Sequence, residues 1–184
     1  MDRHFFARDP VIVAEELIGC KLVRRTGHGT IRVRITETEA YRGADDPASH
    51  AYRGPTPRNK PMFGAVGCLY VYFIYGMHHC MNIVAHPPGE PGAVLIRAAA
   101  AEQGIGLLRL NRPGAPDSRL TDGPGKLAKA LGIDLSHNGL DLFAAGSETL
   151  TVEPPDRRYA CAASGRVGIK AGADLPWRFT GAYE

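Results

Sequence analysis

The middle of this chain lacks acidic residues: no Asp or Glu occurs within residues 47–89 of the 184-residue sequence. The same window holds four of the seven histidines and six aromatic residues, together with Arg53, Arg58 and Lys60. The formal net charge of +3 is too small by itself to imply a polyanionic partner. Because the acids lie mostly elsewhere, we expect one locally positive, aromatic-rich surface, which is typical of a protein that binds nucleic acid.

Several other features are missing, and each absence excludes a class of protein. No apolar run reaches the roughly 18 residues that a membrane-spanning helix needs, and the first residues lack the apolar core of a signal peptide. The four cysteines form no C-x-x-C pair, which indicates free buried thiols rather than a zinc site or a disulfide frame. There is no internal repeat or low-complexity linker. We therefore expect one cytoplasmic domain without a membrane role.

Predicted helices and strands are intermixed without a regular βαβ rhythm. A helix begins at Asp9-Pro10, where Asp can cap the first turn, and ends near Gly19. Such a mixture favours a single α+β domain over residues 1–184, with a mainly antiparallel sheet. Further helices are predicted over residues 99–110 and 126–131, and strands over residues 20–25, 31–41, 69–75, 80–85, 93–98, 150–152 and 166–169.

The clearest strand, residues 31–41, ends in carboxylates whose direction is ambiguous. Apolar side chains alternate along its first half. If the alternation continues, Glu37, Glu39 and Tyr41 lie on the apolar side, where carboxylates are costly unless they line a pocket or find partners. Alternatively, the strand ends or bulges near Thr36 and the acids turn to solvent. The alternation of side chains between the two faces of the strand, which we call its parity, leaves both interpretations open.

A long irregular segment, residues 42–67, precedes a predicted β-hairpin with its tip at residues 76–79. Long loops within compact domains are often functional. Aromatic residues in strands usually belong to a core, but these alternate, so rings occupy both faces of the hairpin. Both faces of an isolated hairpin cannot be core, and one face or the tip is therefore a contact surface. The rings belong to Tyr70, Tyr72, Phe73 and Tyr75.

Two weaker signals have ordinary explanations. The glycine-rich residues 122–126 lack the spacing of a nucleotide-binding P-loop, although a helix start there can either grip a DNA phosphate or be a simple cap. The adjacent His78 and His79 point to opposite faces of an extended chain, so they are poorly placed to ligate one ion. We expect neither a metal nor a cofactor.

Several blocks of the chain, in the right order, resemble the alkyladenine (3-methyladenine, methylpurine) DNA glycosylase family, and together they cover nearly the whole chain. The match extends from Asp9-Pro10-Val11 to the C-terminal blocks. The blocks are Glu37-Thr38-Glu39-Ala40-Tyr41, Thr56-Pro57-Arg58-Asn59, Tyr70-Val71-Tyr72-Phe73-Ile74-Tyr75-Gly76-Met77, Met81-Asn82-Ile83, Val94-Leu95-Ile96-Arg97-Ala98, Gly123-Pro124-Gly125-Lys126-Leu127, Arg166-Val167-Gly168-Ile169 and Pro176-Trp177-Arg178-Phe179.

The resemblance implies a water-mediated cleavage of the N-glycosidic bond. Glu39 resembles the general base, Arg97 resembles the residue that holds the water beside it, and the carbonyl of Val167 resembles the third partner. Hydrolysis builds positive charge on the sugar, and a carboxylate close by can stabilise this charge and accept the water proton. Parity does not distinguish Glu37 from Glu39, so the choice rests on the resemblance alone. With no lysine at the matched pocket positions, we expect no strand cleavage.

The resemblance also implies a pocket for a flipped purine. Tyr41, His50 and Tyr72 resemble its aromatic walls, and Asn82 resembles the residue that clashes with the 2-amino group of guanine. Stacking on such walls offsets part of the stacking that the base loses in the duplex, at about 1–3 kcal/mol per base. A lesion alkylated at N3 or N7 is already cationic and leaves readily, whereas neutral hypoxanthine needs a proton, for which His50 is one candidate.

Contacts with DNA are expected at the hairpin and on the basic surface. Tyr75 resembles the wedge that fills the gap in the duplex, and Met77, Arg58, Lys60 and Lys126 are candidate contact residues.

The family implies a single mixed domain with a curved antiparallel sheet, flanking helices and a protruding hairpin, similar to the C-terminal domain of formyltransferases. The expected partner is double-stranded DNA containing a damaged purine, bound by a nucleoid-associated monomer without cofactor or metal. Two other functions remain open. One is a non-catalytic binder of distorted nucleic acid, which has no need of a Glu39–Arg97 pair. The other is a small-molecule hydrolase, with or without a metal, which leaves the acid-free window unexplained.

Overall fold

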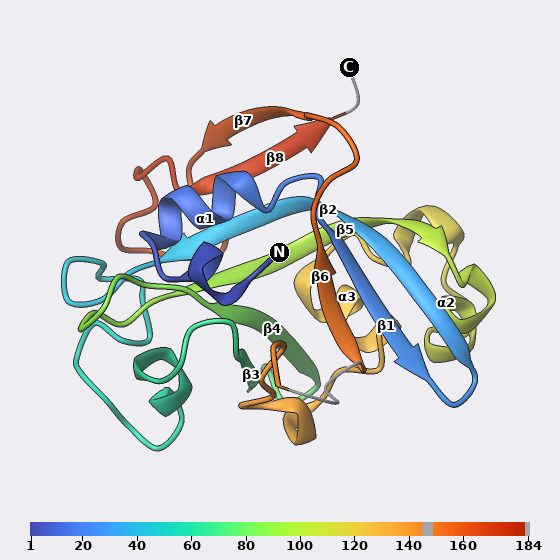
Figure 1. Cartoon of the computed structure of the whole chain (residues 1–184), viewed down its shortest axis with the longest axis horizontal. Helices are drawn as coiled ribbons and strands as arrows, with labels where there is room; N and C mark the ends of the chain where they lie inside the picture. The colour runs from blue at the N-terminus through green and yellow to red at the C-terminus, as the bar shows by residue number, and fades with distance from the viewer. Residues whose placement is uncertain (145–148, 183–184) are drawn as a thin grey trace.

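One continuous antiparallel sheet forms the centre of the protein (Figure 1). The structure is a computed structural model that describes residues 1–144 and 149–182. Within them the strand order is β3-β4-β5-β2-β1-β6, and β8 pairs with both β2 and β7. The mixed α+β class with an antiparallel sheet is therefore confirmed. The strands are β1 (Lys21–Thr26), β2 (Gly29–Tyr41), β3 (Leu69–Ile74), β4 (His78–Val84), β5 (Ala93–Gln103), β6 (Leu150–Glu153), β7 (Ala160–Ser164) and β8 (Arg178–Ala182).

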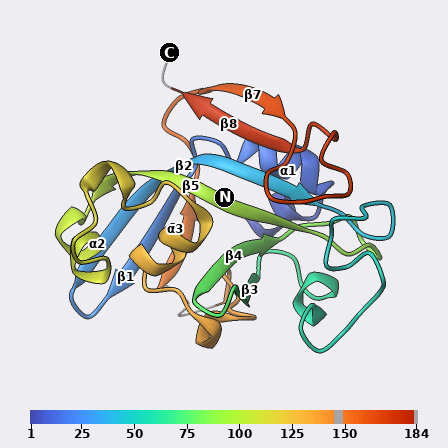
Figure 2. The same ribbon diagram turned by 180° about the vertical axis from the view of Figure 1, so that it is seen from behind.

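Helices cover both sides of the sheet. Helix α1 (Pro10–Glu16) lies in front of the sheet in Figure 1, and the reversed view in Figure 2 brings α3 (Pro124–Ala130) to the front with α2 (Ile105–Asn111) beside it. The Asp9 side chain accepts a hydrogen bond from the Val11 amide at 2.9 Å, as predicted for an N-cap before Pro10. Leucines from both helix layers join the same buried core, among them Leu17, Leu108 and Leu127.

Strand β2 positions the site because it pairs with three neighbours. Its residues 29–34 pair with β1 and its residues 37–39 with β8, while β5 runs along most of its other edge. The β2–β5 register shifts around Thr36 and Glu37, so the predicted irregularity is present. The carboxylates nevertheless do not turn to solvent: Glu39 is 0% exposed, and the Glu37 side chain is 18% exposed. The interpretation in which they turn outward is wrong.

Other predicted elements need correction. Residues 99–103 continue β5 and are not helical, and the helix starts only after Gly104, whose φ of 78° interrupts the strand. Residues 166–169 form no strand, whereas β7 and β8 were not predicted. Strand β8 lies between β2 and β7, and the alanine-rich β7 outside it is exposed along most of its length, so its sequence carries no apolar alternation.

The predicted hairpin is present, but its turn is shorter than expected. Ile74 pairs with His78, so β4 begins at His78 and the tip consists of residues 75–77. Tyr75 adopts a φ of 53°, in the left-handed region. His78 packs against Gly125 at the start of α3, and the His79 ring lies 5.0 Å from that of Phe73. The His78 contact holds the hairpin beside α3, and the His79 contact joins its two strands.

The four cysteines are free, as expected, but only Cys20 and Cys80 are buried, whereas Cys68 is partly buried and Cys161 is exposed. Within residues 1–144 and 149–182, the structure contains no helix with the length and apolar character needed to cross a membrane.

Candidate active site

A buried carboxylate, that of Glu39, lies at the centre of the site. Its Oε2 accepts hydrogen bonds from the Tyr41 hydroxyl at 2.8 Å and from Arg97 Nη1 at 3.2 Å. Its Oε1 accepts the backbone amide of Val167 at 2.8 Å. These three donors compensate the burial of an ionised group, which is costly without partners. Burial and the charge of Glu39 raise the pKa of Tyr41, so its hydroxyl stays protonated and keeps donating.

Arg97 reaches Glu39 from the neighbouring strand β5. In the β2–β5 register Glu37 faces Ala98 and Thr38 faces Ile96, so Arg97 is an extra residue without a partner in β2. Such bulges redirect side chains and are common beside active sites. Burial works against the charged guanidinium, but Glu39 and Glu37 outweigh it and raise the pKa of Arg97. Arg97 is therefore a permanent cation beside the carboxylate.

Glu37 has different partners from Glu39. Its Oε1 accepts Arg97 Nε at 2.7 Å and Arg178 Nε at 2.6 Å. Arg178 also donates to the Ser164 hydroxyl, with its Nη1 at 3.1 Å from Oγ. Glu37 thus lies between two guanidinium groups, one of which contacts Glu39.

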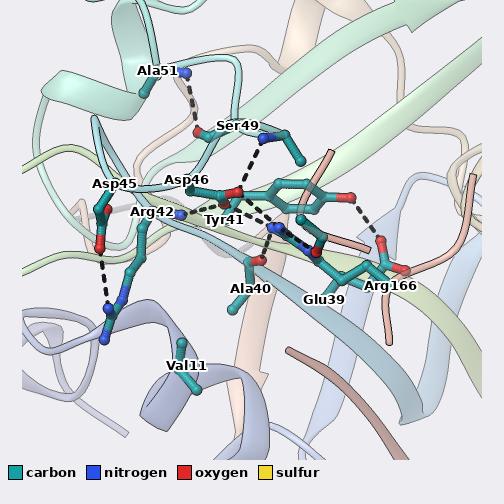
Figure 3. Close-up of polar contacts among 12 residues, drawn as sticks. Val11, Glu39, Ala40, Tyr41, Arg42, Asp45, Asp46, Ser49, Ala51 and Arg166 are labelled. Atoms are coloured by element: carbon teal, nitrogen blue, oxygen red, sulfur yellow. Dashed lines mark hydrogen bonds and ion pairs between the residues drawn. The ribbon is translucent and has the colours of Figure 1, made fainter. Parts of the chain in front are cut away.

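A second ion pair fixes the two loops around the carboxylate. Arg166 makes two 2.7 Å contacts with the Asp46 carboxylate, and both side chains are 0% exposed. The same guanidinium donates to the Ala40 carbonyl at 3.0 Å and lies 4.8 Å from the centre of the Tyr41 ring (Figure 3). Asp46 belongs to the irregular segment after β2, and Arg166 directly precedes Val167. Their pair therefore holds the Val167 amide against Glu39.

A cavity of about 600 Å³ opens in front of these groups. Glu39 lies directly behind its wall, because the three residues that bond to its carboxylate all line the cavity. The volume is within the range of small-molecule sites. Further lining residues come from the hairpin, the irregular segment and the start of α3. They include Ala48, His50, Met62, Tyr70, Tyr72, Tyr75, Cys80, Asn82, Lys126 and Ile169.

Aromatic rings form one wall of the cavity. The His50 ring lies 4.7 Å from that of Tyr72 and shares a 2.8 Å hydrogen bond between Nδ1 and the Tyr70 hydroxyl. Burial raises the pKa of Tyr70 to about 12 and also raises that of Tyr72, so both phenols are neutral at physiological pH. Desolvation, followed by the nearby Arg58, lowers the pKa of His50. A neutral imidazole suits a stacking wall better than it suits a proton donor.

Asn82 is held in place at the bottom of the cavity. It is 3% exposed, and its Nδ2 donates to the Tyr70 carbonyl at 2.9 Å. Register pairs it with Tyr70 in β3 and with Leu95 in β5. A side chain fixed in this way presents one defined polar surface to any ring that enters.

The structure brings most of the predicted site residues to this cavity, but not all of them. Met77, Arg58 and Lys60 do not line it. Met77 is 69% exposed beside Tyr75, which is 80% exposed. Arg58 lies over the Tyr72 ring at 5.3 Å and donates to the Phe73 carbonyl at 3.3 Å, while Lys60 is exposed. Arg58 therefore lies beside one wall of the cavity, whereas Met77 and Lys60 are exposed outside its lining.

Lys126 lies at the rim of the cavity, although the sequence placed the lysines outside the pocket. Its Nζ is 2.8 Å from Asp122 Oδ1, one helical turn away. Within the described part of the chain, no group of three or more His, Cys, Asp or Glu side chains is arranged to hold a metal ion.

Several residues of the site carried no signal in local sequence patterns. Asp46 and Arg166 are 120 positions apart, and neither lies in a helix or strand of the structure. Tyr70 was expected to belong either to the core or to a contact surface, without a defined partner. Arg166 and Arg178 belong to blocks that carried the family resemblance, and this was the signal that could have identified them.

Comparisons with known proteins agree with this geometry. The model of the methylpurine-DNA glycosylase family matches residues 4–183. A relative from Carboxydothermus hydrogenoformans is 45% identical over 97% of this chain and 93% of its own length. Relatives from Streptomyces avermitilis and Burkholderia lata are 46% and 45% identical over 97% and 98% of this chain, and 86% of their own lengths. All three are provisionally named as 3-methyladenine DNA glycosylases.

Proposed function

Because the chain belongs to the methylpurine-DNA glycosylase family, whose members hydrolyse N-glycosyl bonds in base-excision repair, we propose that it excises damaged purines through a water activated by Glu39. The substrates are alkylated or deaminated purines in duplex DNA, of the 3-methyladenine, 7-methylguanine, hypoxanthine and ethenoadenine class. The product is an abasic site. The whole chain, residues 1–184, acts as one glycosylase domain, in the cytoplasm and on the nucleoid.

The observation that carries this proposal is the set of partners around Glu39. A carboxylate offers about four lone pairs. Oε2 accepts two hydrogen bonds and Oε1 accepts one, so Oε1 retains the capacity to take a proton from water. Glu37 bonds only to guanidinium groups among the described residues, which favours Glu39 as the base. Since Glu39 has no exposed surface, the water must enter between Arg97 and Val167 when the lesion binds.

The cavity supports base flipping. Chemistry on a purine inside a duplex requires that the nucleotide be extruded. The walls formed by Tyr41, His50 and Tyr72 provide stacking surfaces, and the exposed Tyr75 ring at the hairpin tip fits the role of a wedge between base pairs. Asn82, fixed at the bottom, excludes the 2-amino group of normal guanine.

We further propose that the enzyme does not cleave the strand. A lyase needs an unprotonated amine within reach of the sugar. Lys126 is the lysine at the cavity rim, and its ion pair with Asp122 favours the protonated form. Borohydride should therefore trap no covalent adduct between the protein and the duplex, and an adduct that Lys126→Arg abolishes would overturn this part of the proposal.

Excision from a defined duplex tests the main proposal. Duplexes that each contain one 7-methylguanine or one hypoxanthine are incubated with the protein in chelator, and abasic sites are counted. Glu39→Gln should retain lesion binding and lose excision by 10²-fold or more, as expected for removal of a general base. Glu153→Gln, which removes a carboxylate paired with Arg32 elsewhere in the sheet, is the control and should excise normally.

Two results would contradict the proposal. Binding of the lesion duplexes without release of any base would indicate a non-catalytic binder of distorted DNA. Full activity in Glu39→Gln together with a complete loss in Glu37→Gln would mean that the base has been assigned to the wrong carboxylate.

A further inference from the structure

We propose that Glu37 is a positioning residue that divides the Arg97 guanidinium between two carboxylates and thereby keeps Glu39 available as a base. This inference rests on the proposed function of Glu39. It assigns Glu37 a part in the reaction, although Glu37 does not line the cavity and, of the residues that donate to the Glu39 carboxylate, bonds to Arg97 alone among the described residues.

The division is visible in the two distances from Arg97. Its Nε lies 2.7 Å from Glu37 Oε1, whereas its Nη1 lies 3.2 Å from Glu39 Oε2. A guanidinium that faces a single carboxylate normally forms two parallel hydrogen bonds through its fork of Nε and Nη donors. Since Glu37 occupies Nε, only one longer contact remains for Glu39.

Glu37 is itself held from the opposite side. Arg178 Nε donates to the same Oε1 at 2.6 Å, and the Ser164 hydroxyl fixes Arg178 in turn. The pairing of β2 with β8 places Arg178 opposite Glu39, two positions along the strand from Glu37. A continuous chain of contacts therefore leads from β7 through Arg178, Glu37 and Arg97 to Glu39. Its two carboxylates and two guanidinium groups balance in charge.

The backbone is shaped for this arrangement. The extra residue in β5 is Arg97 itself, and the register shift in β2 falls between Ile35 and Thr38, around Glu37. The two irregularities compensate, so regular pairing resumes at Thr38 and Ile96. Bulges disrupt the ladder and are kept where a side chain must be re-aimed. Here they direct the Arg97 side chain into the space between Glu37 and Glu39.

Loss of the Glu37 charge should change the chemistry of Glu39 in two ways. The freed Nε can turn to Glu39, and a second hydrogen bond would occupy the lone pair that accepts the water proton. The nearby negative charge that disfavours ionisation of Glu39 would also disappear. Both changes make Glu39 a weaker base that is harder to protonate.

The rate of excision as a function of pH separates this role from a structural one. Single-turnover rates are measured on a 7-methylguanine duplex, because this base is already cationic and needs no acid. In Glu37→Gln we expect the plateau rate to fall about tenfold, a part of the 10²–10⁴-fold that a general base contributes. The acid limb of the profile should move to lower pH, and the Kd for the lesion duplex should stay unchanged.

The acid limb reports on the carboxylates because the other groups around Glu39 do not titrate there. Arg97 and Tyr41 both have raised pKa values, and burial raises the pKa of both Cys80 and Tyr72, which lie beside them. Arg178 faces Glu37 as a further permanent cation. His50 titrates in the cavity but is common to every variant, so it cannot produce a difference between them.

Glu102→Gln is the matched control. Glu102 lies in the same strand as Arg97 and is likewise shared by two cations, Arg34 at 3.2 Å and Lys21 at 4.0 Å, but it is remote from the cavity. Its removal should leave the rate and the acid limb unchanged. Glu37→Asp keeps the charge with a shorter reach, and we expect it to lie between the wild type and Glu37→Gln in both measures.

Three outcomes would overturn the inference while leaving the proposed function intact, since wild-type excision and its loss in Glu39→Gln are measured separately. The first is a folded Glu37→Gln protein with an unshifted acid limb. The second is a rate loss that active-site titration traces to a smaller active fraction. The third applies if Glu37→Gln does not fold: a folded Glu37→Asp protein then shows an acid limb that coincides with that of the wild type.

Discussion

Glu37 and Glu39 lie two positions apart on one strand, and their neighbours give them different properties. Glu37 meets two guanidinium groups at 2.7 and 2.6 Å, the arrangement of a structural ion pair. Glu39 meets a hydroxyl, a backbone amide and one more distant guanidinium contact. Hydrogen bonds from neutral donors compensate a buried charge while leaving it less strongly paired than a bidentate arginine does. The residue type therefore matters less here than the donors around it.

The buried pair of Asp46 and Arg166 should be a major source of stability for the site. Breaking a fully buried ion pair leaves an uncompensated charge, so Asp46→Asn and Arg166→Met should each lower the free energy of unfolding by about 3–5 kcal/mol. Because the two groups share one interaction, the double variant should lose less than the sum of the single variants. Urea unfolding of all four proteins measures both effects. Additive losses would show that the two side chains contribute independently.

His50 should make folding stability depend on pH. Its pKa in the folded protein is lowered by desolvation, so below the unfolded value of about 6.5 the unfolded chain binds more protons than the folded one. This contribution is fully present above that pH and diminishes as the pH falls. Thermal unfolding between neutral and mildly acidic pH should therefore show a steeper loss of Tm in the wild type than in His50→Gln. Parallel curves for the two proteins would contradict the lowered pKa.

At the scale of single residues, sequence reasoning identified the right segments but not the partners. Parity placed Glu39 on an inward-facing row, and its complete burial agrees with that interpretation. Parity treats Glu37 and Glu39 alike, however, because what separates them is contributed by Arg178 and Val167, which are more than 120 positions away. Contacts of this range follow from strand pairing and loop placement, which local patterns do not encode.

The hairpin is the element whose backbone departs most clearly from the local optimum. Tyr75 is the non-glycine residue with a positive φ among residues 1–144 and 149–182, and its ring is 80% exposed. A side chain in the left-handed region costs roughly 1–2 kcal/mol. Strain of this kind, without burial to compensate it, is typical of functional positions.

Two substitutions at Tyr75 should separate the effect of the ring on DNA binding from the effect of backbone strain on stability. Tyr75→Ala and Tyr75→Gly both remove the wedge, so both should weaken lesion-specific DNA binding to the same extent. Glycine relieves the positive φ, so Tyr75→Gly should be more stable to unfolding than Tyr75→Ala by about 1 kcal/mol. Binding titrations and urea unfolding measure the two effects. Wild-type affinity in both variants would exclude an intercalating role for this ring.

At the scale of elements, the sequence predicted the long central strands and the hairpin well, and it failed where burial is one-sided or weak. Alanines in residues 98–101 have high helix propensity, yet they continue β5 because β2 pairs with them. Strands β7 and β8 lack a regular apolar alternation; β8 is held by its pairing with β2, and β7 by its pairing with β8. Tertiary pairing decided both cases against local propensity.

At the scale of the whole molecule, the uneven charge distribution leaves one acid-free region, which we expect to bind DNA. The acid-free window contributes His50 and Tyr72 of the proposed walls, the hairpin tip and several exposed cations, while the carboxylate that we propose as the base comes from the strand that precedes the window. Family membership and the curved antiparallel sheet could be predicted from the sequence. The cavity itself could not, because it forms only where β2, the hairpin, the start of α3 and the Val167 segment meet.

A face of this kind should bind DNA with a strong dependence on salt. Each phosphate contact that a cation makes releases counterions, so the slope of log K against log salt falls by about one for each lost contact. Arg58→Ala and Lys60→Ala, which each remove an exposed cation of the acid-free window, should therefore each reduce the slope by about one and weaken lesion and undamaged duplexes alike. Lys21 lies in β1, where it pairs with Asp156, so Lys21→Ala is the control and should leave the slope unchanged. Sedimentation with a lesion duplex should give one protein per duplex, since the proposed enzyme acts as a monomer. A slope unchanged in both Arg58→Ala and Lys60→Ala would place the DNA on another face of the molecule.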